Sequence, residues 1–191
     1  MDWTMVFDEI QQAPGATDAM ISEFVAEIRR PLSQAEVERI NRSQQNPFPR
    51  HDPLHASWRP FRADRWTVPE RTLPSSYLSL LRWSNGGWCR TGEREFGFFP
   101  ALGEQHGVRA MMLAYHLPEY MPGALPIAFN GGGTFYVFDM RRPAVSGEYP
   151  VVCVRAGNLG WDPDECWRVA DTFLAACRGP TNVDDLRDGE W

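Results

Sequence analysis

The feature that most constrains the fold of this chain is a pair of apolar runs separated by a glycine-rich turn. Residues 125–129 read Leu-Pro-Ile-Ala-Phe, residues 134–139 read Thr-Phe-Tyr-Val-Phe-Asp, and Asn-Gly-Gly-Gly at 130–133 separates them. Two such runs around a short turn are typical of antiparallel strands that lie side by side. Residues 94–100 and 149–155 also read as strands, so the sequence predicts three or more antiparallel strands.

Two helices are predicted before these strands. Apolar residues between 20 and 28 recur at helical spacing after Asp18, and Pro31 ends the pattern. Ser33 and Glu36 then have the spacing of a capping box, in which the Ser hydroxyl and the Glu carboxylate each accept a hydrogen bond from a free backbone amide. The apolar stripe of both helices is narrow, so we expect them to lie on a core rather than to form one.

Three more helices are predicted, one before the first of these strands, one among them and one after them. Residues 73–83 have a wide apolar face, and residues 108–115 fit a shorter helix. The clearest signals stand at 162–178, where Asp162 has the place of an N-cap and Pro163 the first helical position. Helices around antiparallel strands predict an α+β class, with a central antiparallel sheet flanked by helices and an N-terminal helical extension.

The length of 191 residues fits a single domain, and composition divides it. We expect a single domain, 1–191, with N-terminal helices at 1–45, a Pro/Arg-rich connection at 46–65, a core at 66–178 and a frayed acidic tail at 179–191. The connection belongs to a basic stretch, because residues 39–71 hold seven arginines and three acidic residues. The same stretch holds five prolines, which make it the least regular part of the chain.

Charge and cysteine usage exclude several classes of protein. All 19 basic residues are Arg, against 25 acidic residues, and the net charge of −6 argues against a nucleic-acid binder whose affinity depends on neutralising phosphates. No signal peptide or membrane-spanning run is visible, so we expect a cytoplasmic protein. The four cysteines have no CxxC spacing, which favours reduced, packed thiols over a disulfide or a metal site.

No residue pattern predicts a catalytic or cofactor site. His51 and His55 have the four-residue spacing of helical metal ligands, but Pro53 between them argues against the helix that this spacing needs. The glycines at 131–133 lead into a strand rather than a helix, so they do not indicate a phosphate-binding loop. We therefore expect no catalytic residues, no metal and no cofactor.

Aromatic rings alternate with arginines in the connection. The pattern comprises Trp58, Arg59, Phe61, Arg62 and Trp66. Trp and Arg are enriched where proteins bind each other, so these five are candidate partner-binding residues. The alternative is that the rings fasten the long segment onto the domain.

Two carboxylates beside the apolar strands, Glu95 and Asp139, are further candidate partner-binding residues. They also carry the enzymatic alternative, a small hydrolase or ligand-binding enzyme that uses Glu95, Asp139 or His116. That alternative requires a pocket that joins these side chains.

Several short motifs follow one another along the chain. They are Leu-Pro-x-x-Tyr-x-x-Leu-Leu at 73–81, Ser-Asn-Gly-Gly at 84–87, Leu-Pro-Ile-Ala at 125–128, the glycines at 131–133 and Phe-Tyr-x-Phe-Asp at 135–139. With a closing helix at 162–178, this order resembles the SUKH superfamily, the Smi/Knr-like domain, over residues 66–178. The motif residues that carry the resemblance are Pro74, Tyr77, Trp83, Asn85, Gly86, Gly87, Pro126, Gly131, Gly132 and Gly133. Residues 41–65 depart from the family by being longer and richer in proline.

The resemblance implies a non-enzymatic α+β domain that binds a protein partner. Many bacterial members resemble immunity proteins that neutralise a cognate polymorphic toxin, often a nuclease, and fungal members are linked to control of cell-wall synthesis. Because no long disordered flank is apparent, we expect the bacterial, immunity type. An acidic chain suits a basic toxin or nuclease surface. We expect no direct binding to nucleic acid or membrane, and the sequence leaves the oligomeric state open.

Overall fold

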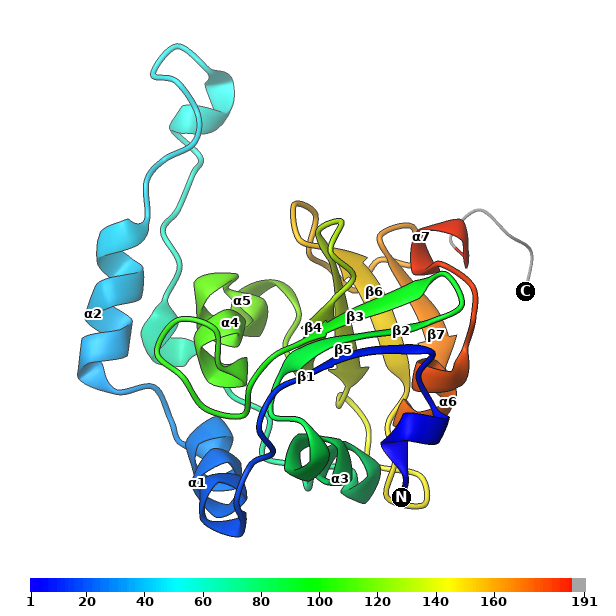
Figure 1. Cartoon of the computed structure of the whole chain (residues 1–191). Helices are drawn as coiled ribbons and strands as arrows, with labels where there is room; N and C mark the ends of the chain where they lie inside the picture. Colours follow the sequence, from blue (N-terminus) through cyan, green and yellow to red (C-terminus); the bar gives the residue numbers. More distant parts are fainter. Residues whose placement is uncertain (187–191) are drawn as a thin grey trace.

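The computed structural model describes residues 1–186 and shows one curved sheet with helices around it (Figure 1). In chain order the elements are the 3-10 helix η1 (Trp3–Met5), β1 (Glu9–Gln12), α1 (Asp18–Arg29), α2 (Gln34–Ser43), the 3-10 helices η2 (Pro53–His55) and η3 (Ala63–Arg65), α3 (Ser75–Trp83), β2 (Gly87–Thr91), β3 (Arg94–Phe98), α4 (Val108–Ala114), α5 (Leu117–Tyr120), β4 (Ala124–Phe129), β5 (Thr134–Asp139), β6 (Val151–Arg155), β7 (Cys166–Ala170), α6 (Phe173–Arg178) and α7 (Val183–Leu186).

The predicted α+β class and antiparallel sheet are confirmed. The seven strands lie in sequence order, and each pairs antiparallel with the next. The hairpin predicted from the apolar runs at 125–129 and 134–139 forms β4 and β5, with Phe129 opposite Phe135 and Ala124 opposite Asp139. Pro126 has no amide to donate to a neighbouring strand, and the register of this pair shifts between Pro126 and Ala128.

Strand β5 is covered on both faces, which explains its unbroken apolar run. All residues from 134 to 138 are buried, and successive side chains point to opposite faces of a sheet. On one face the Phe135 ring packs against Tyr115, next to α4, with centroids 4.8 Å apart. On the other face Phe138 packs against Tyr77 of α3 at 5.4 Å and against Phe173 of α6 at 5.7 Å.

The predicted capping box at the start of α2 is confirmed. Ser33 Oγ accepts a hydrogen bond from the Glu36 amide at 3.3 Å, and a Glu36 carboxylate oxygen accepts one from the Ser33 amide at 2.7 Å. The same carboxylate receives two hydrogen bonds from the buried Arg109 of α4, at 2.9 and 3.1 Å. We call this contact the Arg109–Glu36 clamp. It fixes the corner between α1 and α2 against α4.

The long closing helix predicted at 162–178 is wrong. Asp162 caps only a turn, in which the Asp164 amide donates to its carboxylate at 3.0 Å. Residues 166–170 form β7, in which Trp167 lies opposite Cys153 of β6. The helical part of this segment is α6 alone, and its N-cap is Thr172, whose hydroxyl accepts from the Ala175 amide. The apolar spacing fitted a helix, but pairing with the exposed edge of β6 provides hydrogen bonds and burial for the same residues.

Residues 179–186, expected to begin a frayed acidic tail, pack against the sheet instead. Val183 of α7 is fully buried, and its carbonyl accepts a hydrogen bond from the Trp167 indole at 2.9 Å. Asp184 accepts from Asn130 and from the Thr134 hydroxyl, both at 3.0 Å, so α7 holds the glycine-rich turn of the β4–β5 hairpin. The rest of the expected tail, 187–191, lies outside the described residues.

Two strands at the N-terminal edge of the sheet have no counterpart among the predicted elements. β1 and β2 pair from Glu9 opposite Arg90 to Gln12 opposite Gly87. Gly86 and Gly87, which link α3 to β2, have positive φ values of 98° and 94°. Gly87 also begins β2, where a Cβ would lie 2.5 Å from the carbonyl oxygen of Gln11 in the neighbouring strand.

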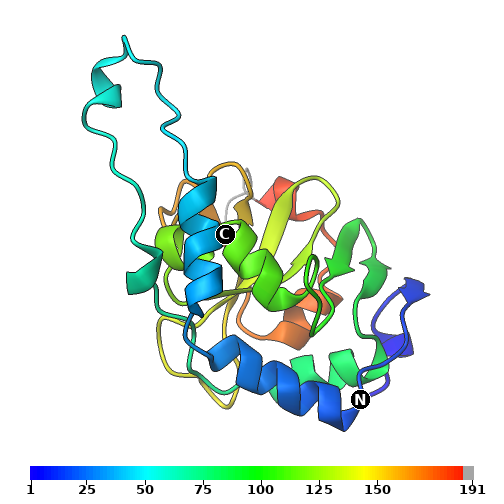
Figure 2. The same cartoon turned by 90° about the vertical axis from the view of Figure 1, so that its left-hand side faces the viewer.

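Residues 44–62 leave the body of the protein and return to it, and we call this segment the arm. Figures 1 and 2 show it extending beyond α2 and turning back through η2. Within residues 1–186, none of the helices has the length and apolar content needed to cross a membrane.

Candidate functional site

The arm is built without paired strands, because four prolines, at 47, 49, 53 and 60, cannot donate backbone hydrogen bonds. Its two sides are joined by side chains instead. The Gln44 amide group contacts the backbone of Phe61 through both its oxygen and its nitrogen, and the Asn46 amide donates to the His55 carbonyl at 3.0 Å. At the tip, Asp52 caps η2 by accepting from the Leu54 amide at 2.8 Å. The arm is therefore an ordered loop that exposes most of its side chains.

An aromatic cluster fastens the base of the arm to α5. The Phe61 ring lies 5.2 Å from the His116 ring and 5.4 Å from the Tyr120 ring, and Trp66 lies 5.5 Å from His116, all measured between centroids. The Trp66 indole also donates a hydrogen bond to the carboxylate of Glu119. Burial in this cluster lowers the pKa of His116, although the nearby Glu119 carboxylate opposes the shift. Burial in the cluster therefore favours the neutral form of the His116 imidazole.

A cleft of about 550 Å³ lies beside this cluster, between the arm and the end of α5. Phe61, Trp66 and prolines form its apolar walls, and three exposed arginines, Arg59, Arg62 and Arg65, lie at its border. We call it the arm-base cleft.

The three arginines differ in their partners. Arg62 forms an ion pair with Asp64 at 2.9 Å, and its hydrogen bond lowers the pKa of that carboxyl. Arg59 donates to two backbone carbonyls, those of Ala56 and Trp58, both at 2.8 Å. Neither Arg59 nor Arg65 forms an ion pair with a carboxylate within residues 1–186. Two guanidinium groups at the cleft therefore remain able to bind an acceptor from another molecule.

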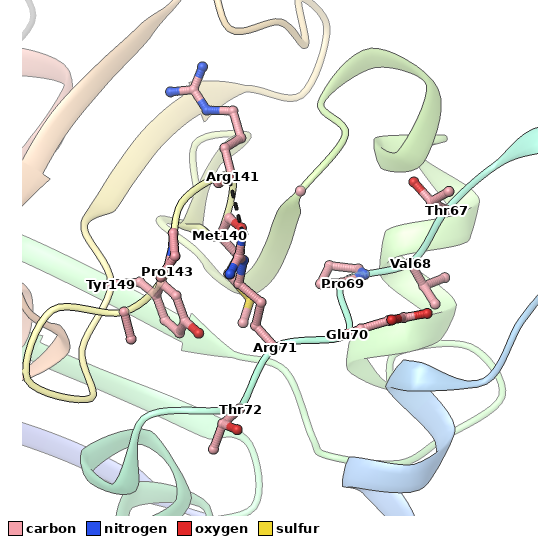
Figure 3. Close-up of a pocket in the computed structure, with 12 residues that line it drawn as sticks. Thr67, Val68, Pro69, Glu70, Arg71, Thr72, Met140, Arg141, Pro143 and Tyr149 are labelled. Atoms are coloured by element: carbon pink, nitrogen blue, oxygen red, sulfur yellow. Dashed lines mark hydrogen bonds between the residues drawn. The ribbon is translucent and has the colours of Figure 1, made fainter.

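A second, larger cleft of about 880 Å³ continues from the first, and Thr67 lines both. Figure 3 shows Arg71 in this cleft with its guanidinium directed at Met140, whose carbonyl accepts a hydrogen bond from Arg71 Nε at 2.7 Å. Arg141 extends away from Arg71, is paired with Asp139 at 2.7 Å and covers the Trp161 ring at 3.8 Å from its centroid. The arginines of this second cleft are thus already used to hold neighbouring segments together.

The sequence model of the SMI1 / KNR4 family (SUKH-1) matches residues 70–175, which include every strand from β2 to β7. The chain belongs to this family. No curated protein matches the chain. Membership of the SMI1/KNR4 family fits a protein of the immunity type or one related to the cell wall, and the family is in general non-enzymatic.

The arm lies before the residues that match the SMI1/KNR4 family, whereas the His116 and Glu119 side chains that anchor it lie within them. The arm-base cleft therefore combines a family element, α5, with a segment outside the matched region. This is the departure from the family at 41–65 that the sequence showed.

The structure brings together only some of the candidate partner-binding residues. Arg59, Phe61, Arg62 and Trp66 line the arm-base cleft, and Trp58 precedes them in the arm. For Phe61 and Trp66 the rings also fasten the segment to the domain, as the alternative reading expected.

The two carboxylates of the SMI1/KNR4 domain that were grouped with the arm lie elsewhere. Glu95 is on β3, and its carboxylate lies beside Gly131 in the hairpin turn. Asp139 ends β5; burial opposes ionisation there, but hydrogen bonds from Arg141 outweigh it and lower the pKa of the Asp139 carboxyl. Neither carboxylate lines the arm-base cleft or the cleft beside Arg71, and His116 contributes to the aromatic cluster. These positions give no support to a shared catalytic pocket.

Two residues of the site, Glu119 and Tyr120, were missed because only the tertiary fold brings them to it. Glu119 and Tyr120 stand more than fifty positions from the arm in the sequence, and nothing in their local pattern points to Phe61 or Trp66. Arg65 was also left out of the candidate residues, although it directly precedes Trp66 and belongs to the same alternation of arginines and rings.

Proposed function

We propose that this protein is an immunity-type binding protein that neutralises a cognate toxin by direct contact, using the arm and the arm-base cleft. The observation that carries the proposal is the projection of an ordered, Arg- and Trp-bearing loop from a domain of the SMI1/KNR4 family. Most residues of this loop are exposed, and hydrogen bonds made by residues 47–59 stay within the arm. A long ordered loop that does little for its own domain is usually a functional one.

Family membership supports a protein partner, and the arm supplies residue types that are enriched at binding hot spots. The absence of a shared pocket for Glu95, Asp139 and His116 in the described structure favours binding over hydrolysis. A cytoplasmic, bacterial setting and a nuclease toxin are part of this proposal.

The test is to co-express the protein with the product of a neighbouring toxin gene and to measure growth rescue and one-to-one complex formation. We expect the wild type to protect, and a variant with residues 47–59 replaced by a Gly/Ser linker of equal length to lose protection. The Arg155→Ala/Arg178→Ala variant, altered at exposed arginines on β6 and α6, is the matched control and should protect. No complex with any neighbouring toxin, or full protection by the linker variant, would contradict the proposal.

A further inference from the structure

Charge is distributed unevenly between the arm region and the rest of the protein. Residues 39–71 carry seven arginines and three acidic residues, a net charge of +4, in a chain whose total is −6. The remainder therefore carries −10. Binding at the arm is governed by this local charge rather than by the total, because charges separated by more than about 10 Å are largely screened at physiological salt.

The arm-base cleft concentrates this local charge beside apolar walls. Arg59 and Arg65 are exposed and form no ion pair with a carboxylate within residues 1–186, and Arg62 is paired with Asp64. Glu119 is the acidic residue that lines the cleft, and its carboxylate already accepts the Trp66 indole hydrogen bond. The cleft thus offers two guanidinium groups without an ion pair, next to the half-buried rings of Phe61 and Trp66.

We infer that the arm-base cleft binds an acidic segment of the partner protein, with partner carboxylates on Arg59 and Arg65 and an adjacent apolar side chain against the Phe61 and Trp66 rings. This inference rests on the proposed function and specifies the chemistry of the partner. Guanidinium groups bind carboxylates in a bidentate, planar geometry and stack on aromatic rings. The partner face that meets the arm is therefore acidic, although the total charge of this protein is also negative.

A nucleic acid fits these observations less well. A polyanion gains affinity from many phosphate contacts, and this cleft supplies two unpaired arginines beside a body of net charge −10. A short carboxylate-bearing peptide requires only those two contacts and an apolar surface.

The first experiment uses the full chain and three labelled probes at physiological ionic strength, about 0.15 M, where charges far from the cleft are largely screened. The probes are a peptide of alternating Glu and Leu, the same peptide with Lys for Glu, and a single-stranded RNA of equal length. We expect the Glu peptide to bind most tightly, and Arg59→Glu/Arg65→Glu to weaken it at least about tenfold, since reversing both charges removes two charge-assisted contacts. The control Arg155→Glu/Arg178→Glu, with the same change in net charge, should weaken it less than about twofold.

Several outcomes would overturn the inference. Equal losses in the two double variants would show an effect of total charge, and tighter binding of the RNA or of the Lys peptide would assign other chemistry to the cleft. Self-association of the wild type that Arg59→Glu/Arg65→Glu abolishes would make a second copy of this chain the occupant.

The second experiment separates this inference from the proposed function. With the toxin in hand, Arg59→Glu/Arg65→Glu should weaken the complex at least about tenfold and reduce its salt dependence. A toxin complex that this variant forms as tightly as the wild type refutes the acidic-segment inference and leaves the immunity function standing. If the protein binds the Glu peptide through the cleft but binds no toxin, the immunity function is refuted and the acidic-segment preference of the cleft stands.

Discussion

The Arg109–Glu36 clamp gives the most quantitative prediction, because one buried side chain joins three segments. Arg109 is 3% exposed and donates five hydrogen bonds, two to the Glu36 carboxylate and three to the carbonyls of Glu27, Arg30 and Pro31. Removing one partner of a buried ion pair costs about 3–5 kcal/mol. Glu36 keeps its contacts with Arg30 and Ser33, so we expect Arg109→Met to cost about 3 kcal/mol.

The assay is equilibrium unfolding in urea at pH 7, followed by tryptophan fluorescence, with a thermal scan in parallel. For a chain of this size, 3 kcal/mol corresponds to a fall in Tm of about 6–12 °C. The matched control is Arg82→Met, which removes an ion pair with Asp18 whose side chains are 47% and 87% exposed. Such exposed pairs contribute about 0.5 kcal/mol. If Arg109→Met loses less than about 1 kcal/mol, as little as the control, the clamp does not stabilise the corner as argued.

The clamp also predicts a pH dependence. Burial opposes ionisation of Glu36, but hydrogen bonds from Arg109, the Ser33 amide and Arg30 outweigh it and hold the pKa of the carboxyl well below its usual range. A lowered folded-state pKa gives stability that is complete above the unfolded value of about 4.3 and is lost as pH falls toward the folded one. The stability difference between wild type and Arg109→Met should therefore be constant from pH 5 to 8 and narrow in stronger acid. A difference that already narrows at pH 6 would contradict this assignment.

Three further predictions concern the arm and the backbone. Replacing residues 47–59 with a Gly/Ser linker should change Tm by less than about 3 °C, since these residues make no hydrogen bond beyond the arm within the described structure. A larger fall of Tm in a thermal scan would show that the arm stabilises the domain. Because burial lowers the pKa of His116, the free energy of unfolding should fall as pH drops below about 6.5. The variant His116→Asn should remove this pH dependence, since Asn suits the left-handed backbone at φ 52°. An unchanged pH profile in the variant would assign the dependence to another group. Gly15→Ala would place a Cβ 2.0 Å from the Arg82 carbonyl oxygen and should cost about 1–3 kcal/mol in urea unfolding. Its control is Gly157→Ala, whose Cβ would meet nothing within 4 Å and which should cost far less. Equal losses of stability in the two variants would contradict the steric argument.

The parts of the fold that sequence predicted are those in which local and tertiary preferences agree. The β4–β5 hairpin has apolar runs that suit a buried strand and glycines that suit its turn, where Gly131 and Gly133 have φ values of 80° and 89°. The capping box at Ser33 is a local hydrogen-bond pattern, so it could be predicted from spacing alone. In both cases the conformation in the folded protein is the one that the local sequence already favours.

The closing segment shows the opposite case. Asp162 and Pro163 favour the start of a helix, and the apolar residues that follow fit helical spacing, yet residues 166–170 add a strand to the open edge of β6. The edge of β6 is a tertiary feature, so no local pattern in this segment reveals it. Strand β1 could not be predicted for the same reason. It has four residues with mostly exposed side chains, and it forms only because β2 lies beside it.

The role of the candidate site stays a prediction, and sequence and structure favour different partner chemistry for it. Alternation of rings and arginines identified Arg59, Phe61 and Trp66, whereas total charge suggested a basic partner. In the structure the positive and negative charges are separated, because arginines line the arm-base cleft and most acidic residues lie elsewhere. The corner held by the Arg109–Glu36 clamp starts α2, and α2 leads directly into the arm. A loss of the clamp should therefore weaken partner binding without changing any residue of the cleft, because it alters where the arm leaves the body.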